Sequence, residues 1–340
     1  MAVSAKAPQV RAEKVVEPGT LVIGVLMGGC SRERAVSLES GRAVAAALEA
    51  LGHDVRPCDV RPGDITSQLF KDVDVAFLAL HGAWGEDGQV QSELEALGVC
   101  YTGSGPEASR LAMDKAASKQ RFFEEGVPTP AFRVAWRGEE AVIEEAYNAL
   151  GPDLIVKPIA EGSSFGLGAC RSLESLRTAV RDLWSDYDAA LIERRVIGKE
   201  LTVGILGERP LPVAEIRTPG GLYDFHFKYE SDETEYIFNH GLAAEVEARM
   251  VGVALAAHGA LGCRDLSRVD LMLPPEGEPQ VLEVNTIPGF TSHSLVPKAA
   301  AHAGITFGHL CERIVALARE RSVPSKTCEQ DTEEEPIGSA

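Results

Sequence analysis

Long apolar segments are missing from this sequence. Its 340 residues contain neither the apolar core of a signal peptide nor a run long enough to cross a bilayer. Residues 1–20 are polar and include Pro8 and Pro18, which is typical of a flexible N-terminal extension. The sequence therefore predicts a cytoplasmic protein that does not interact with a membrane.

Basic residues are also few. Lysine and arginine number 33 against 51 aspartates and glutamates, which gives a formal net charge of −18. Proteins that bind nucleic acid or anionic membranes need a basic face, so both partners are excluded. Part of the charge lies in residues 321–340, which lack a hydrophobic pattern and are predicted to form a disordered acidic tail.

Paired cysteines and the common nucleotide-binding signatures are absent as well. The seven cysteines are scattered without a CxxC pair, which argues against a disulfide framework and a zinc site. No GxxxxGK[ST] loop occurs, and no GxGxxG sequence opens a helix after a first strand. Any nucleotide site must therefore be of another kind.

The sequence does contain a regular succession of apolar segments. Apolar residues make up 45% and charged residues 25%, as in a globular protein of two or three domains. Apolar runs predict buried strands at 21–27 and 73–80, and helices are expected up to Gly52 and over 88–97, before a short strand at 99–102. Such alternation predicts a parallel sheet.

A Gly/Ser/Pro-rich segment at residues 103–106 predicts a boundary. One helix is expected from there to Gly126. The later strands are predicted at 132–135, 154–157, 189–193, 200–206, 266–273 and 281–285, and the later helices at 139–149, 173–184, 242–261, 295–303 and 307–319.

The strongest chemical signal is a carboxylate and an amide inside the apolar strand at 281–285. Because side chains alternate along a strand, Glu283 and Asn285 share one face. Arg268 and Asp270 repeat this spacing on another apolar segment. Two neighbouring strands of this kind could pool three oxygen ligands for a hard divalent cation, while the arginine could clamp a carboxylate or phosphate. A simple salt bridge is the alternative interpretation.

Residues 161–168 form a Gly/Ser-rich loop shortly after a strand that ends at Lys157. The N–H groups of such a loop and the lysine could neutralise phosphate charge, although a plain surface loop is the alternative. Glu193 and Glu200 stand at the ends of two further apolar segments. They could accept hydrogen bonds from adenine and ribose, or they could be exposed acids.

Residues 29–37 join the first predicted strand to its helix, which is the usual ligand crevice of an open parallel sheet. The helix N-terminus favours an anionic group, and Glu33 is either part of that site or an ordinary first-turn charge. His81 ends the second predicted strand and could equally be incidental. Lys228 and Tyr229 belong to a polar segment that could close over a site.

Taken together and in this order, the motifs resemble those of the D-alanine–D-alanine ligase family, within the ATP-grasp superfamily. The resemblance extends over residues 21–319. The motifs that carry it are GGxSxERxVSL at 28–38, LHGxxGEDG at 80–88, YTGSG at 101–105, MDK at 113–115, VKPxxEGSSxG at 156–166, RxDxML at 268–273 and LExNTxPGxTxxSLxP at 282–297.

This resemblance implies an α/β fold that is α+β in its ATP-grasp part. A Rossmann-like domain with a parallel sheet is expected at residues 21–105. A two-part ATP-grasp fold would follow, with a small central domain at 106–196 and a C-terminal substrate domain at 197–320. The family also implies a homodimer and the ATP-dependent ligation of two D-alanine molecules for peptidoglycan precursors, through an acyl phosphate.

The resemblance further implies the residues of the nucleotide and metal sites. Lys115 and Lys157 resemble the lysines that contact ATP phosphates, and Lys228 resembles one that meets the γ-phosphate on loop closure. Glu193, Val196 and Glu200 match the contacts to adenine and ribose. The family's ligands of two Mg²⁺ (or Mn²⁺) ions match Asp270, Glu283 and Asn285.

The amino-acid site follows in the same way. Glu33 resembles the residue that anchors the ammonium of the first D-alanine, with Ser163 and Tyr229 in its hydrogen-bond network. Arg268 and the N–H of Gly289 would stabilise the acyl phosphate and the tetrahedral intermediate. His81, Ser294 and Leu295 complete the set of substrate contacts. Since tyrosine at position 229 goes with dipeptide synthesis, Tyr229→Phe is predicted to loosen discrimination against D-lactate.

Two other functions stay open at this point. One is an ATP-grasp carboxylate–amine ligase that acts on different amino acids. The other is a catalytically inactive nucleotide-binding regulator, against which the intact set of lysines and metal ligands argues. Release of ADP with a panel of D- and L-amino acids discriminates between these alternatives.

Overall fold

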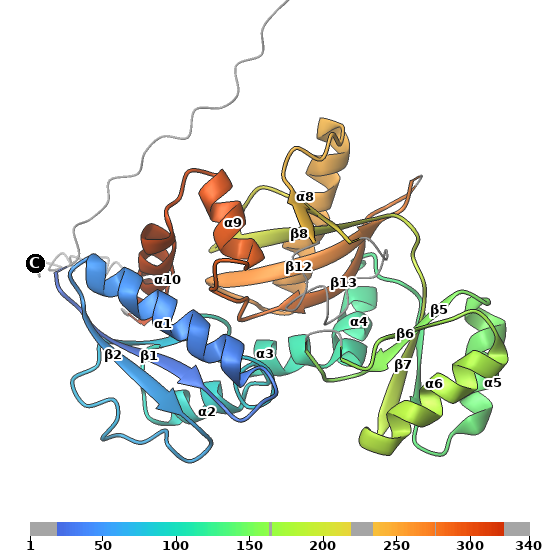
Figure 1. The fold of residues 1–340 in the computed structure, drawn as a ribbon, viewed down its shortest axis with the longest axis horizontal. Helices are drawn as coiled ribbons and strands as arrows, with labels where there is room; N and C mark the ends of the chain where they lie inside the picture. The colour runs from blue at the N-terminus through green and yellow to red at the C-terminus, as the bar shows by residue number, and fades with distance from the viewer. Residues whose placement is uncertain (1–18, 163–164, 219–233, 276, 323–340) are drawn as a thin grey trace, which may run out of the picture.

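Three β-sheets organise the protein. The computed structural model describes residues 19–162, 165–218, 234–275 and 277–322. Within these residues, a parallel sheet near the N-terminus is followed by two antiparallel sheets, and helices cover each of them (Figure 1). This mixed architecture confirms the predicted fold class, while the exact domain boundaries stay predictions.

The N-terminal sheet has the order β2-β1-β3, and all its strands are parallel. β1 (Val22–Gly28) and β3 (Val75–Leu78) were the expected apolar strands, whereas β2 (Asp54–Val60) is half exposed and gave no apolar run. α1 (Arg34–Ala50) and α2 (Gln89–Ala96) follow β1 and β3. The strand predicted at 99–102 is wrong, because Tyr101 forms only an isolated bridge to Ala76.

The single helix predicted up to Gly126 is also wrong, because the chain breaks it at Asp114. α3 (Pro106–Met113) ends there and α4 (Lys115–Glu124) begins. The Asp114 carboxylate accepts a hydrogen bond from the Ala117 N–H at 2.9 Å and caps the new helix. Lys115 is the first residue of α4. This position places it beside the second sheet, where its backbone N–H donates to the Ile159 carbonyl.

The second sheet is antiparallel, with the order β4-β7-β5-β6. Its strands are β4 (Phe132–Trp136), β5 (Leu154–Pro158), β6 (Gly168–Cys170) and β7 (Ala189–Arg194). α5 (Glu140–Leu150) and α6 (Leu173–Asp186) cover one face and close its hydrophobic core.

The third sheet has six strands among the described residues, with β11-β10-β8-β12-β13 in order and β9 paired to β8. These strands are β8 (Lys199–Leu206), β9 (Arg209–Pro210), β10 (Ala214–Arg217), β11 (Glu235–Ile237), β12 (Leu266–Leu273) and β13 (Gln280–Asn285). α8 (Ala244–Ala260) packs on this sheet and completes its core.

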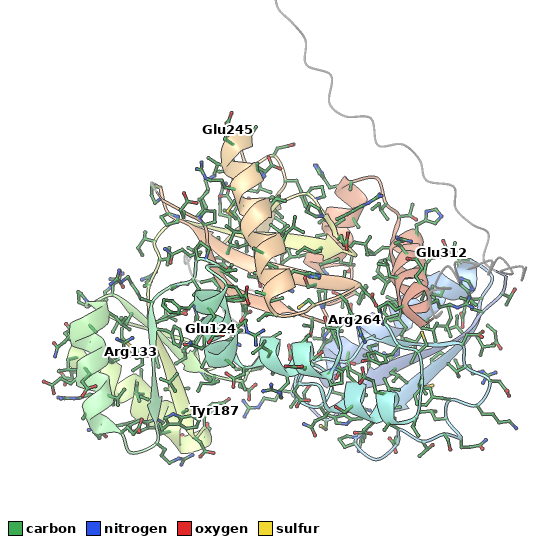
Figure 2. The ribbon with its side chains drawn as sticks, turned by 180° about the vertical axis from the view of Figure 1, so that it is seen from behind. Glu124, Arg133, Tyr187, Glu245, Arg264 and Glu312 are labelled. Atoms are coloured by element: carbon green, nitrogen blue, oxygen red, sulfur yellow. The ribbon has the colours of Figure 1, made fainter. Side chains whose placement is uncertain are left out.

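The last two helices return to the N-terminal sheet. α9 (Leu295–His302) and α10 (Phe307–Ser322) share one hydrophobic core with β1, β3 and α1. Leu310 and Ile314 of α10 are buried in it together with Val44 and Leu48 of α1. Each such side chain contributes about 1.5–3 kcal/mol through burial. The first and last described segments therefore form a single packed unit, seen from behind around Glu312 (Figure 2).

Among the helices in the described ranges, none is long and apolar enough to pass through a lipid bilayer.

Candidate active site

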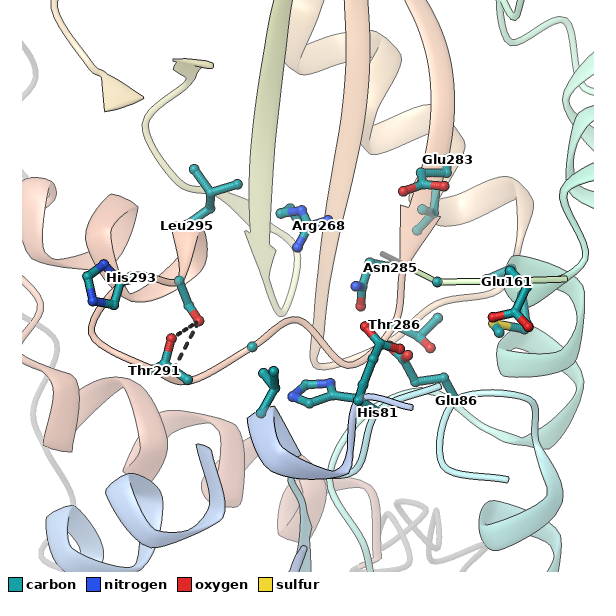
Figure 3. A pocket seen from close by; sticks show the side chains of 18 of the residues that line it. His81, Glu86, Glu161, Arg268, Glu283, Asn285, Thr286, Thr291, His293 and Leu295 are labelled. Atoms are coloured by element: carbon teal, nitrogen blue, oxygen red, sulfur yellow. Dashed lines mark hydrogen bonds between the residues drawn. The ribbon is translucent and has the colours of Figure 1, made fainter. Parts of the chain in front are cut away.

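Two adjoining pockets lie where the three sheets meet. The first opens between the N-terminal sheet and the third sheet, and residues from β13, α9 and the segment after β3 line it (Figure 3). The second lies between the second and third sheets and is lined by β5, β7, β8, β12 and β13. Lys115, Glu161 and Glu283 line both pockets, so these three side chains form their common wall.

The candidate metal ligands stand on two adjacent antiparallel strands. In the register of β12 and β13, Asp270 pairs with Glu283 and Arg268 pairs with Asn285. The two segments are therefore neighbouring strands, as expected, and that their two carboxylates and one amide hold a metal stays a prediction. Asp270 is buried, and the Thr202 hydroxyl donates to its Oδ1 at 2.7 Å.

Basic side chains neutralise the two carboxylates. The Arg268 guanidinium donates to Asp270, with Nη2 at 2.8 Å from Oδ2 and Nε at 2.9 Å from Oδ1. Lys115 Nζ lies 3.3 Å from Glu283 Oε2 and donates to the Glu161 carbonyl at 2.6 Å. Asp270 and Glu283 thus each have a cation next to them, which offsets the cost of taking their charges out of water.

The second pocket holds the residues expected to bind a nucleotide. Lys157, predicted to end its strand, stands one residue before the end of β5 and donates to Glu193 of β7 with 2.7 Å between Nζ and Oε1. Burial opposes ionisation of Glu193, but the charges of Lys157 and Lys119 outweigh it and lower the pKa of its carboxyl. Val196 and Glu200 line the same pocket. The structure therefore brings the predicted residues together in one pocket, namely Lys157, Glu193, Val196 and Glu200.

Glu33 and His81 meet at the floor of the first pocket. Glu33 immediately precedes α1, and both Gly82 and Gly162 approach its carboxylate so closely that an added Cβ would lie within 3 Å of Oε2. His81 is buried, and its Nε2 lies 3.4 Å from the Ser40 hydroxyl. Burial lowers the pKa of this imidazole, so a neutral histidine faces the pocket.

The opposite end of the first pocket is the N-terminus of α9. Ser294 is the N-cap of this helix, and Gly289 lies in the turn before it. The Thr291 N–H donates to Ser294 Oγ at 3.0 Å, which fixes the serine within the turn (Figure 3). Leu295 follows at the first helical position. Unpaired N–H groups at a helix start favour a carboxylate ligand.

Some predicted residues cannot be placed. Ser163, Lys228 and Tyr229 lie outside the described residues. The closing of the segment around Lys228 and Tyr229 therefore stays a prediction, as does the effect of Tyr229→Phe on discrimination against D-lactate.

Sequence reasoning missed two buried charged groups. Lys119 lies 3.0 Å from Glu193 Oε2, and its spacing of four from Lys115 on one helix was an available signal. Glu86 faces Glu33 in the first pocket, where burial and the negative charge of Glu33 raise the pKa of its carboxyl to about 8. Its Oε2 accepts from the Gly82 N–H at 2.6 Å.

Comparisons with known protein families identify two matching family models. The family model described as the D-ala D-ala ligase C-terminus matches residues 124–316. The model described as the D-ala D-ala ligase N-terminus matches residues 60–104.

Curated relatives and solved structures that resemble this chain are also ligases of D-amino acids. A D-alanine–D-alanine ligase of Aromatoleum aromaticum is 45% identical over 302 residues, covering 87% of this chain and 96% of the relative. One from Geobacter sulfurreducens is 44% identical, covering 88% and 94%. The crystal structure of the Bacillus anthracis D-alanine–D-alanine ligase complexed with ATP has a TM-score of 0.78 at 33% identity, covering 89% and 99%. A D-Ala:D-Ser ligase from Enterococcus faecalis has a TM-score of 0.79 at 28% identity, covering 88% and 100%.

The C-terminal model spans β5, β7, β8, β12 and β13, which line the second pocket, and α9, which lines the first; the N-terminal model spans His81 and Glu86. The chain belongs to the D-alanine–D-alanine ligase family.

Proposed function

We propose that this protein uses ATP to join two D-alanine molecules into D-alanyl-D-alanine, a precursor of peptidoglycan. The observation that carries this proposal is the wall shared by the two pockets. Lys115, Glu161 and Glu283 face both, so a phosphate in the second pocket and a carboxylate in the first would meet there. A carboxylate is a poor electrophile, and phosphorylation converts it into an acyl phosphate with a good leaving group.

The second pocket would hold ATP. Lys157 and Lys115 are placed to contact its phosphates, while Glu193, Glu200 and the backbone of Val196 would receive adenine and ribose. Pre-positioned cations stabilise the charge that develops on oxygen during phosphoryl transfer and need no reorganisation at the moment of reaction.

The oxygen-bearing side chains of β12 and β13 suit two Mg²⁺ (or Mn²⁺) ions. Among the described residues no cluster of three or more His, Cys, Asp or Glu side chains is found. Asp270, Glu283 and Asn285 instead offer two carboxylates and one amide oxygen. Magnesium keeps waters and phosphate oxygens and takes few protein ligands, so a partial set of hard oxygen donors suits it. Bound there, the ions would offset the charge of the phosphates.

The first pocket would bind the two amino acids. Glu33 would hold the ammonium of the first D-alanine, with the neutral His81 beside it. Arg268 and the Gly289 N–H would stabilise the oxygens of the acyl phosphate and of the tetrahedral intermediate. The start of α9, with Ser294 and Leu295, would receive the carboxylate of the second D-alanine, whose amine then attacks the acyl carbon.

Exclusion of water is part of the proposed mechanism, because water would hydrolyse the acyl phosphate. Ser163, Lys228 and Tyr229 would contribute from the segments that close over the pockets. A cytoplasmic location, where ATP is available, and a homodimeric state complete the proposal. Light scattering of the purified protein tests the dimer.

Incubation with ATP, Mg²⁺ and D-alanine, followed by mass spectrometry, tests the function. We expect ADP, phosphate and the alanyl dipeptide in equal amounts. The matched control replaces D-alanine with L-alanine and should give no product. Absence of the dipeptide from the D-alanine reaction would refute the proposal.

A second candidate concerns only the second substrate. The similarity to a D-Ala:D-Ser ligase makes D-serine the relevant competitor. Equimolar D-alanine and D-serine in one reaction measure this choice directly. If D-alanyl-D-serine were the main product, the second substrate would be D-serine rather than D-alanine. The proposed ATP chemistry would be unchanged.

A further inference from the structure

Glu193 is held between two lysines that lie in different environments. Lys157 Nζ approaches its Oε1 at 2.7 Å, and Lys119 Nζ approaches its Oε2 at 3.0 Å. The Glu193 side chain is 3% exposed and that of Lys119 is 0% exposed. Of these three residues, Lys157 and Glu193 line the second pocket, whereas Lys119 is not among its lining residues. Lys119 therefore supports the pocket from behind.

The position of Lys119 is fixed by a second contact. Its Nζ donates to the Thr129 hydroxyl at 2.7 Å, and that hydroxyl donates to the Val281 carbonyl at the start of β13. Burial lowers the pKa of the Lys119 ammonium to about 8, with Glu193 acting in the opposite direction. The lysine thus stays mainly charged at neutral pH and is anchored between α4 and β13.

The two oxygens of Glu193 are held from different sides. Lys119 lies at Oε2 behind the pocket, whereas Oε1 is held by Lys157, which lines the pocket together with Glu193. An ionised carboxylate is only an acceptor, whereas a protonated one can also donate. Its charge state therefore decides whether it binds an amino group or a carbonyl group on a ligand.

The two lysines have different tasks once a nucleotide is bound. Lys157 faces the pocket and can turn to phosphate, which weakens its hold on Glu193. A buried carboxylate without a cation beside it is strongly disfavoured. Lys119, which no ligand in the pocket reaches, is the cation that stays with Glu193.

We propose that Lys119 is a positioning residue that keeps Glu193 as a fixed, ionised acceptor and so sets the preference for adenine over purines with a 6-carbonyl group. The 6-amino group of adenine donates to such a carboxylate, while the 6-carbonyl of hypoxanthine meets it acceptor to acceptor. The inference rests on the proposed function, because it requires ATP in the second pocket.

The test compares ATP with inosine triphosphate, because their bases differ only in the 6-amino and 6-carbonyl groups. In Lys119→Met we expect the KM for ATP to rise at least tenfold and the ATP-to-inosine-triphosphate ratio of kcat/KM to fall at least tenfold. The kcat at saturating ATP and the KM for D-alanine should stay within twofold. Lys119→Arg should restore most of the ratio, and the exposed Lys71→Met is the matched control.

A second variant pair keeps the test valid if Lys119→Met does not fold. Glu193→Gln and Glu193→Gln/Lys119→Met remove first one charge and then both, and a neutral pair tolerates burial. Equal nucleotide ratios in these two variants support action through Glu193. A further change in the double variant, or an unchanged ratio in Lys119→Met, overturns the inference. If the parent protein forms no dipeptide with ATP, the proposed function fails instead.

Discussion

Asp270 of β12 and Glu283 of β13 are directly opposite each other across an antiparallel pair of strands. Two carboxylates in this relationship repel unless positive charge lies near them. Arg268 and Lys115 supply that charge in the ligand-free protein. The proposed metal role would use the same pair, because a divalent cation would compensate the two carboxylates in place of these basic side chains.

Replacement of Glu283 by glutamine should remove one hard ligand without changing side-chain volume. We expect kcat to fall by about 100-fold or more, and the Mg²⁺ concentration needed for half-maximal activity to rise, because one charged group of the transition-state environment is lost. Titration with Mg²⁺ at saturating ATP measures both effects. Glu278→Gln, an exposed acid before the same strand, is the control. Undiminished activity of Glu283→Gln would contradict the metal role.

Gly162→Ala should displace the carboxylate of Glu33 while leaving its chemical identity unchanged. A Cβ at position 162 would lie 2.7 Å from Glu33 Oε2, and the carboxylate can move because it ends a flexible side chain. We therefore expect little change in thermal stability but a rise of about tenfold in the KM for the first D-alanine. Steady-state kinetics at varied D-alanine measure it. Gly168→Ala, whose Cβ would meet nothing within 4 Å, should behave like the parent.

Glu86 should make the ligand-free protein less stable as pH rises. The pKa of its carboxyl is raised from 4.5 to about 8, so the folded state holds a proton that the unfolded state releases in this window. Stability is therefore complete below pH 4.5 and declines up to about pH 8, by at most about 1.4 kcal/mol per pH unit. Glu86→Gln should flatten this decline. Unfolding midpoints between pH 5 and 8 measure it, and parallel curves for the two proteins would refute the assignment.

His258 should make the folded protein less stable as pH falls, which is opposite to the effect of Glu86. Burial lowers the pKa of its imidazole from 6.5 to about 4, and its Nδ1 lies 2.7 Å from the Ser267 hydroxyl. The unfolded state takes up a proton first, so stability is lost as pH falls from 6.5 to 4. His258→Gln should lose less stability over this range. Thermal unfolding at pH 7, 5.5 and 4.5 tests this, with the exposed His309→Gln as the control.

The proposed metal ligands could be grouped from the sequence because strand periodicity acts over a few residues. The two-residue spacing of Glu283 and Asn285 determined their common face, and the structure confirms it. Lys119 was not predicted to be important because its role depends on a residue that is distant in the sequence. Its partner Glu193 is 74 positions away in the sequence, so the spacing of four from Lys115 could point to a shared helix face but not to this contact. Glu86 likewise drew no prediction of its own, because its burial near Glu33 is visible only in the folded chain.

Errors in the predicted elements have a similar origin. β2 was missed because its residues alternate charge and proline with few apolar side chains, so that only pairing with β1 makes it a strand. The break at Asp114 was missed because the flanking residues all favour helix. There the cap formed with the Ala117 N–H overrides local propensity.

The sequence by itself determined the order of the elements, the ligand faces of the strands and the family motifs, because each depends on neighbouring residues. Only the tertiary structure decided that α10, at the end of the described chain, completes the core of the first sheet. It also decided that the two pockets share Lys115, Glu161 and Glu283. Such contacts arise when distant apolar surfaces are buried together, and this free energy depends on the assembled shape rather than on any one segment.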